Sequence, residues 1–181
     1  MTRHRFLWLS TLPLLSGCAN IPDTYAPPVQ RKPLAALDPY PFGAFIEMGS
    51  PRAEAYIVRD VAEPEGGQWR WTRKRPELQF YLDGIEGLHY TMDFSIADAT
   101  FKDTGPVAIA ISINGRPFDS LRFAKPGEHH YRKPVPAELL RAHAPNLVLM
   151  EIDKEWVSKS DGAVLGFILA SAGFKHAVSE P

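Results

Sequence analysis

Cysteine and surplus positive charge are both scarce in this chain. Cys18 is the single cysteine among 181 residues, so no disulfide within the chain can support the fold. Lysine and arginine number 20 against 21 aspartate and glutamate, which gives a net charge of −1. A nucleic-acid-binding protein needs a basic face, and this balance therefore argues against a nucleic-acid partner.

The signatures of common catalytic sites are absent as well. The chain has no Gly-x-Ser-x-Gly, no His-Glu-x-x-His and no glycine-rich phosphate-binding loop. Ser50, between Gly49 and Pro51, has no neighbour that would activate it as a nucleophile. No pair of carboxylates stands in a context typical of glycoside hydrolysis. These absences predict a protein that is not an enzyme and needs no cofactor, with an unrecognised hydrolase as an alternative.

A long apolar run is missing, although a short one opens the chain. Arg3 and Arg5 precede an apolar stretch of about ten residues, which the small residues Ser16 and Gly17 follow. A helix that spans a bilayer needs ~20 apolar residues, so a transmembrane anchor is not expected. The pattern predicts an export signal over residues 1–17.

The motif Leu15-Ser16-Gly17-Cys18 resembles the lipobox of bacterial lipoproteins. The resemblance implies that residues 1–17 are removed and that the Cys18 thiol receives diacylglycerol. Each buried CH₂ of an acyl chain contributes ~0.8 kcal/mol, so several chains hold a protein stably at a membrane. Ala19 stands where lipoproteins retained at the inner membrane often carry aspartate, which implies the outer membrane of the cell envelope. An ordinary signal peptide with an incidental cysteine is the alternative.

The segment 18–41 contains six of the 17 prolines and few large apolar side chains. Such a segment cannot bury enough surface to offset its ordering entropy. We expect it to form an extended tether that carries a folded domain over 42–176, followed by a short tail at 177–181.

Three segments alternate apolar and polar residues with the period of two that is typical of strands half-buried in an antiparallel sheet: 78–82, 88–96 and 107–113. Asn114-Gly115 follows the third segment, and both residues tolerate the positive φ of a type I′ turn, so 107–123 is expected to form a hairpin. Further strands are expected at 45–49, 55–60, 68–72, 129–133, 147–153 and 164–174.

Helical patterning is confined to a short segment near 136–144, which begins at Pro136. Eight or nine short strands with one short helix predict an all-β, antiparallel sandwich or barrel. Helices are too few for an α/β fold.

Four groups of residues between 65 and 174 resemble β-sandwich modules of the galactose-binding-like, jelly-roll type. They are Trp69-Arg70-Trp71 with Pro76 to Phe80, Ile113-Asn114-Gly115, Val135-Pro136 with Leu147 to Ile152, and Trp156 with Asp161-Gly162 and Leu165-Gly166. The resemblance implies a jelly-roll sandwich and a non-catalytic module that binds carbohydrate. Related modules often carry arginine where this chain has Ala163. The loop that contains Asp161 therefore lacks one polar group that those modules could use to bind a ligand.

Two groups of polar residues resemble metal ligands. His129 and His130 are adjacent on an expected strand and point to opposite faces, so they cannot share one ion and are expected at the surface. Asp98 and Asp103 flank an expected loop, where calcium would need six or more oxygen ligands, several from the backbone. No metal site is predicted, and a structural Ca²⁺ in that loop stays an open alternative.

Aromatic residues are the better indication of a binding site, because sugar rings stack on aromatic faces while polar neighbours bind the hydroxyls. Trp156 lies in a polar loop with Asp161, and Tyr131 and Arg132 lie on an expected strand. These four residues form the predicted ligand-binding site.

Trp69 and Trp71 are two residues apart and are expected to pack in the core. The basic run around them, formed by Arg70, Arg73, Lys74 and Arg75, is expected to be solvated.

The sequence therefore predicts a lipid-anchored, non-catalytic envelope protein whose β-sandwich binds carbohydrate or another envelope component. The alternative is a structural lipoprotein that docks a protein partner. An exposed tryptophan with polar groups in a cleft or on a sheet face favours a glycan, whereas a broad apolar patch favours a protein.

Overall fold

The computed structural model describes residues 40–64 and 67–176. The predicted signal over 1–17, Cys18, the tail at 177–181 and all of the tether except Tyr40 and Pro41 lie outside the described residues. The elements are β1 (Phe45–Glu47), the 3₁₀ helix η1 (Ala53–Tyr56), β2 (Ile57–Val61), β3 (Arg70–Leu82), β4 (Leu88–Ile96), α1 (Asp98–Thr104), β5 (Val107–Ile113), β6 (Arg116–Phe123), β7 (Gly127–Pro134), the 3₁₀ helix η2 (Ala137–Leu139), β8 (Ala144–Ile152), β9 (Trp156–Val157), β10 (Val164–Leu165) and β11 (Ile168–His176).

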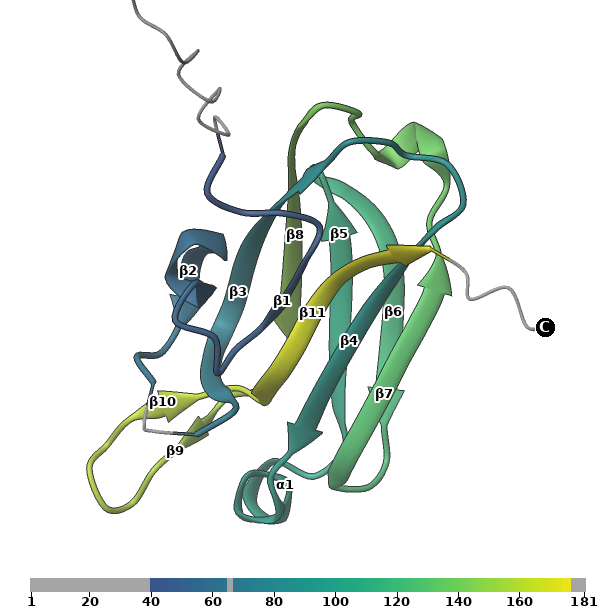
Figure 1. Ribbon diagram of the computed structural model, residues 1–181. Coiled ribbons are helices and arrows are strands. Elements are labelled where there is room, and N and C mark those ends of the chain that lie inside the picture. Colours follow the sequence, from purple (N-terminus) through teal and green to yellow (C-terminus); the bar gives the residue numbers. More distant parts are fainter. Residues whose placement is uncertain (1–39, 65–66, 177–181) are drawn as a thin grey trace, which may run out of the picture. The chain divides into compact units, whose positions relative to one another are not determined.

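The strands form an antiparallel sheet that curls on itself, which confirms the predicted all-β fold class (Figure 1). Hydrogen-bonded neighbours follow the order β6-β5-β8-β3-β11-β4-β7, with β1 on β11 and β2 on β3. β3 joins the two halves, because its residues 77–82 pair with β8 and its first two residues pair with β11. In Figure 1 the half made of β1, β11, β4 and β7 lies in front of β8, β5 and β6.

The core lies between the two halves of this sheet. Phe80 on β3 packs edge-on against Phe174 on β11, with ring centroids 5.5 Å apart. The buried Tyr90 on β4 donates a hydrogen bond from its hydroxyl to the sulfur of Met150 on β8, at 3.4 Å. Since these side chains come from opposite halves, one continuous apolar core holds the sandwich together.

The alternating patterns predict the core face of the main strands correctly. β4 alternates buried and half-buried residues along its whole length, and the odd residues of β5 are buried as expected. The predicted hairpin is present as β5 and β6, with φ of 52° at Asn114 and 77° at Gly115. Both values lie in the left-handed region that the turn requires.

The helix expected near 136–144 is shortened to η2, a single 3₁₀ turn. The residue before a proline avoids the α conformation, and Ala144 precedes Pro145. The side-chain amide of Asn146 then bonds the backbone of Arg141 and of Ala144, which holds this stretch as a loop.

The α-helix of the domain lies elsewhere, in α1, where a loop between Asp98 and Asp103 was expected. Its sequence carries the usual signals, with Asp98 in the first turn, Lys102 in the last and Gly105 at φ 66° after the end. In the part of the chain that the structure describes, we find no helix with the length and apolar character to cross a bilayer.

At the start of β3, the side chains that are buried are not the ones that the sequence predicts. Arg70 and Thr72 are buried, whereas Trp69 is 36% exposed and Trp71 is half-buried beside it. Thr72 fixes this orientation, because its hydroxyl donates to the carbonyl of Phe167 and accepts from the amide of the same residue. The prediction that both tryptophans pack in the core is therefore wrong.

Arg70 is buried, although the basic run to which it belongs is predicted to be solvated. Its Nε donates to the carbonyl of Met48 at 3.1 Å, and its guanidinium pairs with the carboxylate of Glu54. A buried guanidinium must find such partners, because an unpaired buried charge is strongly unfavourable. The other three residues of the run, Arg73, Lys74 and Arg75, are exposed as expected.

Candidate functional site

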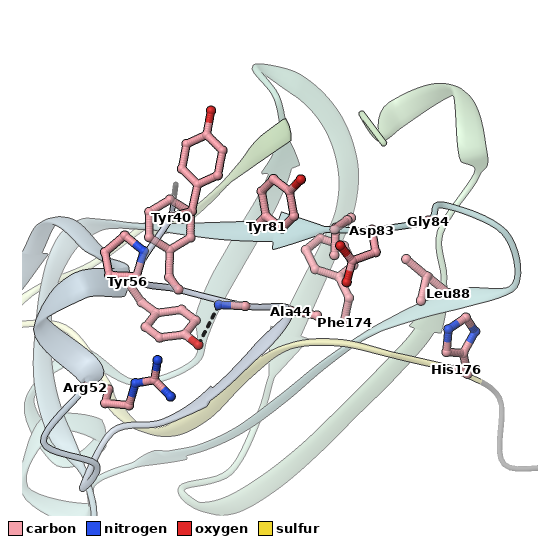
Figure 2. Close-up of a pocket in the computed structure, with 14 residues that line it drawn as sticks. Tyr40, Ala44, Arg52, Tyr56, Tyr81, Asp83, Gly84, Leu88, Phe174 and His176 are labelled. Carbon is pink, nitrogen blue, oxygen red and sulfur yellow. Dashed lines mark hydrogen bonds between the residues drawn. The ribbon is translucent and has the colours of Figure 1, made fainter. Parts of the chain in front are cut away.

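A cleft of about 390 Å³ lies where the chain enters β1 (Figure 2). Its walls come from four separate segments: the residues before β1, the region of η1, the turn from β3 to β4, and the end of β11. We call it the tyrosine cleft and define it by Tyr40, Arg52, Tyr56, Tyr81, Asp83 and His176. Its volume falls in the range of about 300–1,000 Å³ that is typical of small-molecule sites.

Hydrogen bonds on both sides fix the segment that crosses the cleft. The amide of Gly43 donates to the Tyr56 hydroxyl at 2.8 Å, and the carbonyl of Gly43 accepts from the amide of Tyr81 at 3.1 Å. The carbonyl of Ala44 accepts from the amide of Phe174 at 2.7 Å. The cleft is thus largely pre-formed, which lowers the entropic cost of binding.

Aromatic rings form the wall and floor of the tyrosine cleft. Tyr40 stacks on Tyr81, with centroids 4.9 Å apart and planes 25° from parallel. Figure 2 shows the Tyr40 and Tyr81 rings side by side. Beneath them, Phe42, Phe174 and Leu88 are buried and give the floor an apolar surface.

Polar side chains occupy the rim. Arg52, Asp83 and His176 are exposed, and they come from different elements. One cation and one carboxylate roughly balance, which suits an uncharged ligand with several hydroxyl groups. Asp83 is the single carboxylate among the described lining residues, so the cleft lacks the carboxylate pair of a glycoside hydrolase.

The predicted site residues Trp156 and Asp161 share the hairpin of β9 and β10. Trp156 is half-buried, and its indole nitrogen donates to Oδ2 of Asp103 at 2.9 Å, which lowers the pKa of that carboxyl. Asp161 is exposed in the turn, where the Ser158 hydroxyl and the Ala163 amide lower its pKa. Ligand binding by these two residues stays a prediction.

Tyr131 and Arg132 lie on β7, which Figure 1 shows apart from the hairpin of β9 and β10. Tyr131 points into the sandwich, where its hydroxyl donates to Oδ2 of Asp119 at 2.6 Å. Burial and this hydrogen bond raise the pKa of Tyr131. Arg132 is exposed on the opposite face. In the described part of the chain, the four predicted residues therefore do not line one common cleft.

His129 and His130 point to opposite faces of β7, as the sequence predicts, but only His130 lies at the surface. His129 is half-buried between the rings of Phe94 and Phe123, with centroid distances of 5.3 and 4.5 Å. Burial lowers the pKa of His129. Within the described ranges, no group of three or more His, Cys, Asp or Glu side chains could hold a metal ion.

On the outer face, His130 and Ser171 both bind Asp93. Nδ1 of His130 lies 2.7 Å from one carboxylate oxygen, and the Ser171 hydroxyl donates to the other at 2.7 Å. A catalytic triad needs histidine between serine and aspartate, where it can take the serine proton. Here the aspartate is central, so Ser171 contacts no histidine that could take its proton.

This network also shifts the pKa of its members. The hydrogen bond and charge of Asp93 raise the pKa of His130. Burial alone would raise the pKa of Asp93, but the bonds from His130 and Ser171 outweigh it and lower that pKa. The carboxylate therefore stays ionised and available as a hydrogen-bond acceptor.

Comparisons with known proteins do not assign the chain to a family. No protein-family model matches the chain, and neither does any curated protein. Solved structures similar to it include an acetyl xylan esterase from the rumen bacterium Butyrivibrio proteoclasticus, with 15% identity, a TM-score of 0.43, and coverage of 73% of this chain and 32% of the esterase. An exo-β-1,3-galactanase from Phanerochaete chrysosporium shares 11% identity at a TM-score of 0.40, over 74% of this chain and 29% of the galactanase.

A family 35 carbohydrate binding module from an environmental isolate is similar over 68% of this chain and 88% of the module, with 13% identity and a TM-score of 0.38. The chain spans about a third of the length of the two enzymes. At these values the likeness carries no argument about ligands, and the galactose-binding-like assignment stays a prediction.

Proposed function

We propose that this protein is a non-catalytic envelope lipoprotein whose β-sandwich binds an uncharged carbohydrate in the tyrosine cleft. The observation that carries the proposal is the combination of the stacked pair Tyr40 and Tyr81, an apolar floor and a rim of balanced charge. Aromatic faces bind the apolar side of a sugar ring, and the rim groups bind its hydroxyls.

Removing one aromatic wall should weaken this binding. We expect Tyr40→Ala to lower the affinity for a retained polysaccharide about tenfold, because a stacking face is lost. Asp83→Asn should lower it by a smaller factor, since the amide replaces one acceptor oxygen of the side chain with a donor. The measurement is retention of detergent-extracted protein on immobilised xylan, galactan and peptidoglycan glycan strands.

Trp156→Ala is the matched control, because it removes an aromatic ring that lies outside the tyrosine cleft, in the site predicted from the sequence. It should bind as the wild type does. Loss of binding in Trp156→Ala alone would move the site to the hairpin of β9 and β10. Absence of retention on every glycan would contradict carbohydrate binding and favour a protein partner.

The membrane anchor is the second part of the proposal, and it is supported by the lipobox ending at Cys18. We expect a palmitate analogue to label the protein in bacterial cells, and Cys18→Ser to abolish the label, because only the thiol accepts the lipid. Ala19→Ser is the control and should keep the label. Labelling of Cys18→Ser would refute lipidation at this residue.

A further inference from the structure

The outer face of β1, β11, β4 and β7 is hollowed in three places. The hollows have volumes of about 220, 320 and 260 Å³, and Asp93 lines all of them. Trp69 lines the hollow at one end and His176 the hollow at the other. We call this surface the polar groove and define it by Trp69, Thr91, Asp93, His130, Lys175 and His176.

The register of the strands explains why the groove exists. One row of directly paired residues crosses all four strands: Glu47, Ser171, Asp93 and His130. The next row is Phe45, Gly173, Thr91 and Arg132. In both rows the outer strands β1 and β7 carry the long side chains, while the central pair is shorter. The long side chains therefore form two walls that follow the strand direction.

The chemistry of the groove suits a polymer with many hydroxyl groups. The Asp93 carboxylate, held by His130 and Ser171, accepts hydrogen bonds at the centre. The ring of Trp69 offers an exposed aromatic surface at one end. Lys175 and Arg132 oppose the carboxylates of Glu47, Asp93 and Glu128 in the three hollows, so the groove carries charges of both signs and no strong preference for an ionic ligand.

The groove also ends beside the tyrosine cleft, at the last described residue of β11. His176 lines both the cleft and the adjoining hollow, and Lys175 lies next to it on β11. From residue 91 to residue 95 of β4 the hollowed face extends about 14 Å, at ~3.4 Å per residue. A surface of that length exceeds the needs of a single sugar.

We infer that the ligand is an extended polysaccharide, which places one end in the tyrosine cleft and lays its following sugars along the polar groove. This inference rests on the proposed function and adds the class of carbohydrate to it. It requires affinity to rise with chain length, because each added sugar contacts further residues of the groove.

The test compares polymer and fragments. Xylan, galactan and peptidoglycan glycan strands are each offered as polymers and as their mono- and disaccharide fragments, and binding to the detergent-extracted protein is measured by calorimetry. Thr91→Tyr fills the floor of the groove with a strand-forming residue, and Trp69→Ala removes its aromatic end. We expect each to weaken polymer binding about fivefold to tenfold and to leave fragment binding unchanged.

Ala110→Tyr is the matched control, since Ala110 is exposed on β5 in the other half of the sheet. It should bind polymer as the wild type does. Equal affinity for polymer and fragments, with Thr91→Tyr behaving as Ala110→Tyr, would overturn the inference and leave the cleft intact. Failure of the wild type to bind any polymer or fragment would overturn the proposed function and the inference with it.

Discussion

Gly173→Ala is expected to destabilise the domain by about 4 kcal/mol, from ~1–3 kcal/mol of overpacking and ~1–3 kcal/mol of backbone strain. Gly173 has φ of 144°, and a Cβ there would lie 2.3 Å from the carbonyl oxygen of Ala44 and 2.5 Å from the Cα of Phe45. Both contacts are backbone atoms of the segment that pairs with β11, so neither can move without breaking that pairing. Urea denaturation measures the loss as a lower midpoint.

Substitutions at two other glycines distinguish the cost of overpacking from the cost of backbone strain. Gly105 has φ of 66° and ψ of −152° with open space around it, so Gly105→Ala should cost about 1–3 kcal/mol from strain alone. Gly84 has open space and no left-handed φ, and Gly84→Ala should stay within about 0.5 kcal/mol of the wild type. A Gly173→Ala midpoint equal to that of Gly105→Ala would show that β1 does not approach β11 this closely.

Gly173→Ala should also weaken the proposed glycan binding. Ala44 belongs to the segment that crosses the tyrosine cleft, and its carbonyl would be displaced by the new methyl group. Stability and binding are thus linked through the pairing of β1 with β11.

Asn146→Ala is expected to cost about 3–5 kcal/mol, because each buried partner left unsatisfied costs ~1–3 kcal/mol. Asn146 is fully buried, and its side-chain amide donates to the carbonyls of Arg141 and Ala144. Its oxygen accepts from the Arg141 amide and from Nδ2 of Asn114. Alanine would remove all four bonds, including the one that Asn114 donates from the turn between β5 and β6.

Leu147→Ala is the control for Asn146→Ala. Leu147 is the next residue on β8 and is 38% exposed, so its truncation should cost about 1 kcal/mol or less. Thermal unfolding of both variants checks the difference. If both lost the same stability, the amide network would contribute nothing beyond local packing.

Much of the fold could be predicted because alternation records burial directly. A strand that buries an apolar face shows that face in the sequence, as β4 and β5 do. The Asn114-Gly115 turn was predictable because few other residues tolerate its backbone. α1 had readable signals in Asp98, Lys102 and Gly105, but its seven residues are too few for a clear apolar period.

The predictions that proved wrong concern residues whose burial or conformation is set by tertiary contacts. Alternation shows that residues 69 and 71 share a face of β3, but it does not show which face is buried. The bonds between Thr72 and Phe167, 95 positions apart, settle that question. Likewise, capture of Arg141 and Ala144 by the Asn146 side chain prevents a helix that the local sequence favours.

By itself the sequence determined the all-β antiparallel class, the hairpin turn and the opposite orientations of His129 and His130, because each depends on residues close together in the chain. It also carries the motif ending at Cys18 that resembles a lipobox, on which the proposed anchor rests. Only the tertiary structure decided where a cleft forms, because the walls of the tyrosine cleft come from segments between Tyr40 and His176 that meet only after the sheet has curled.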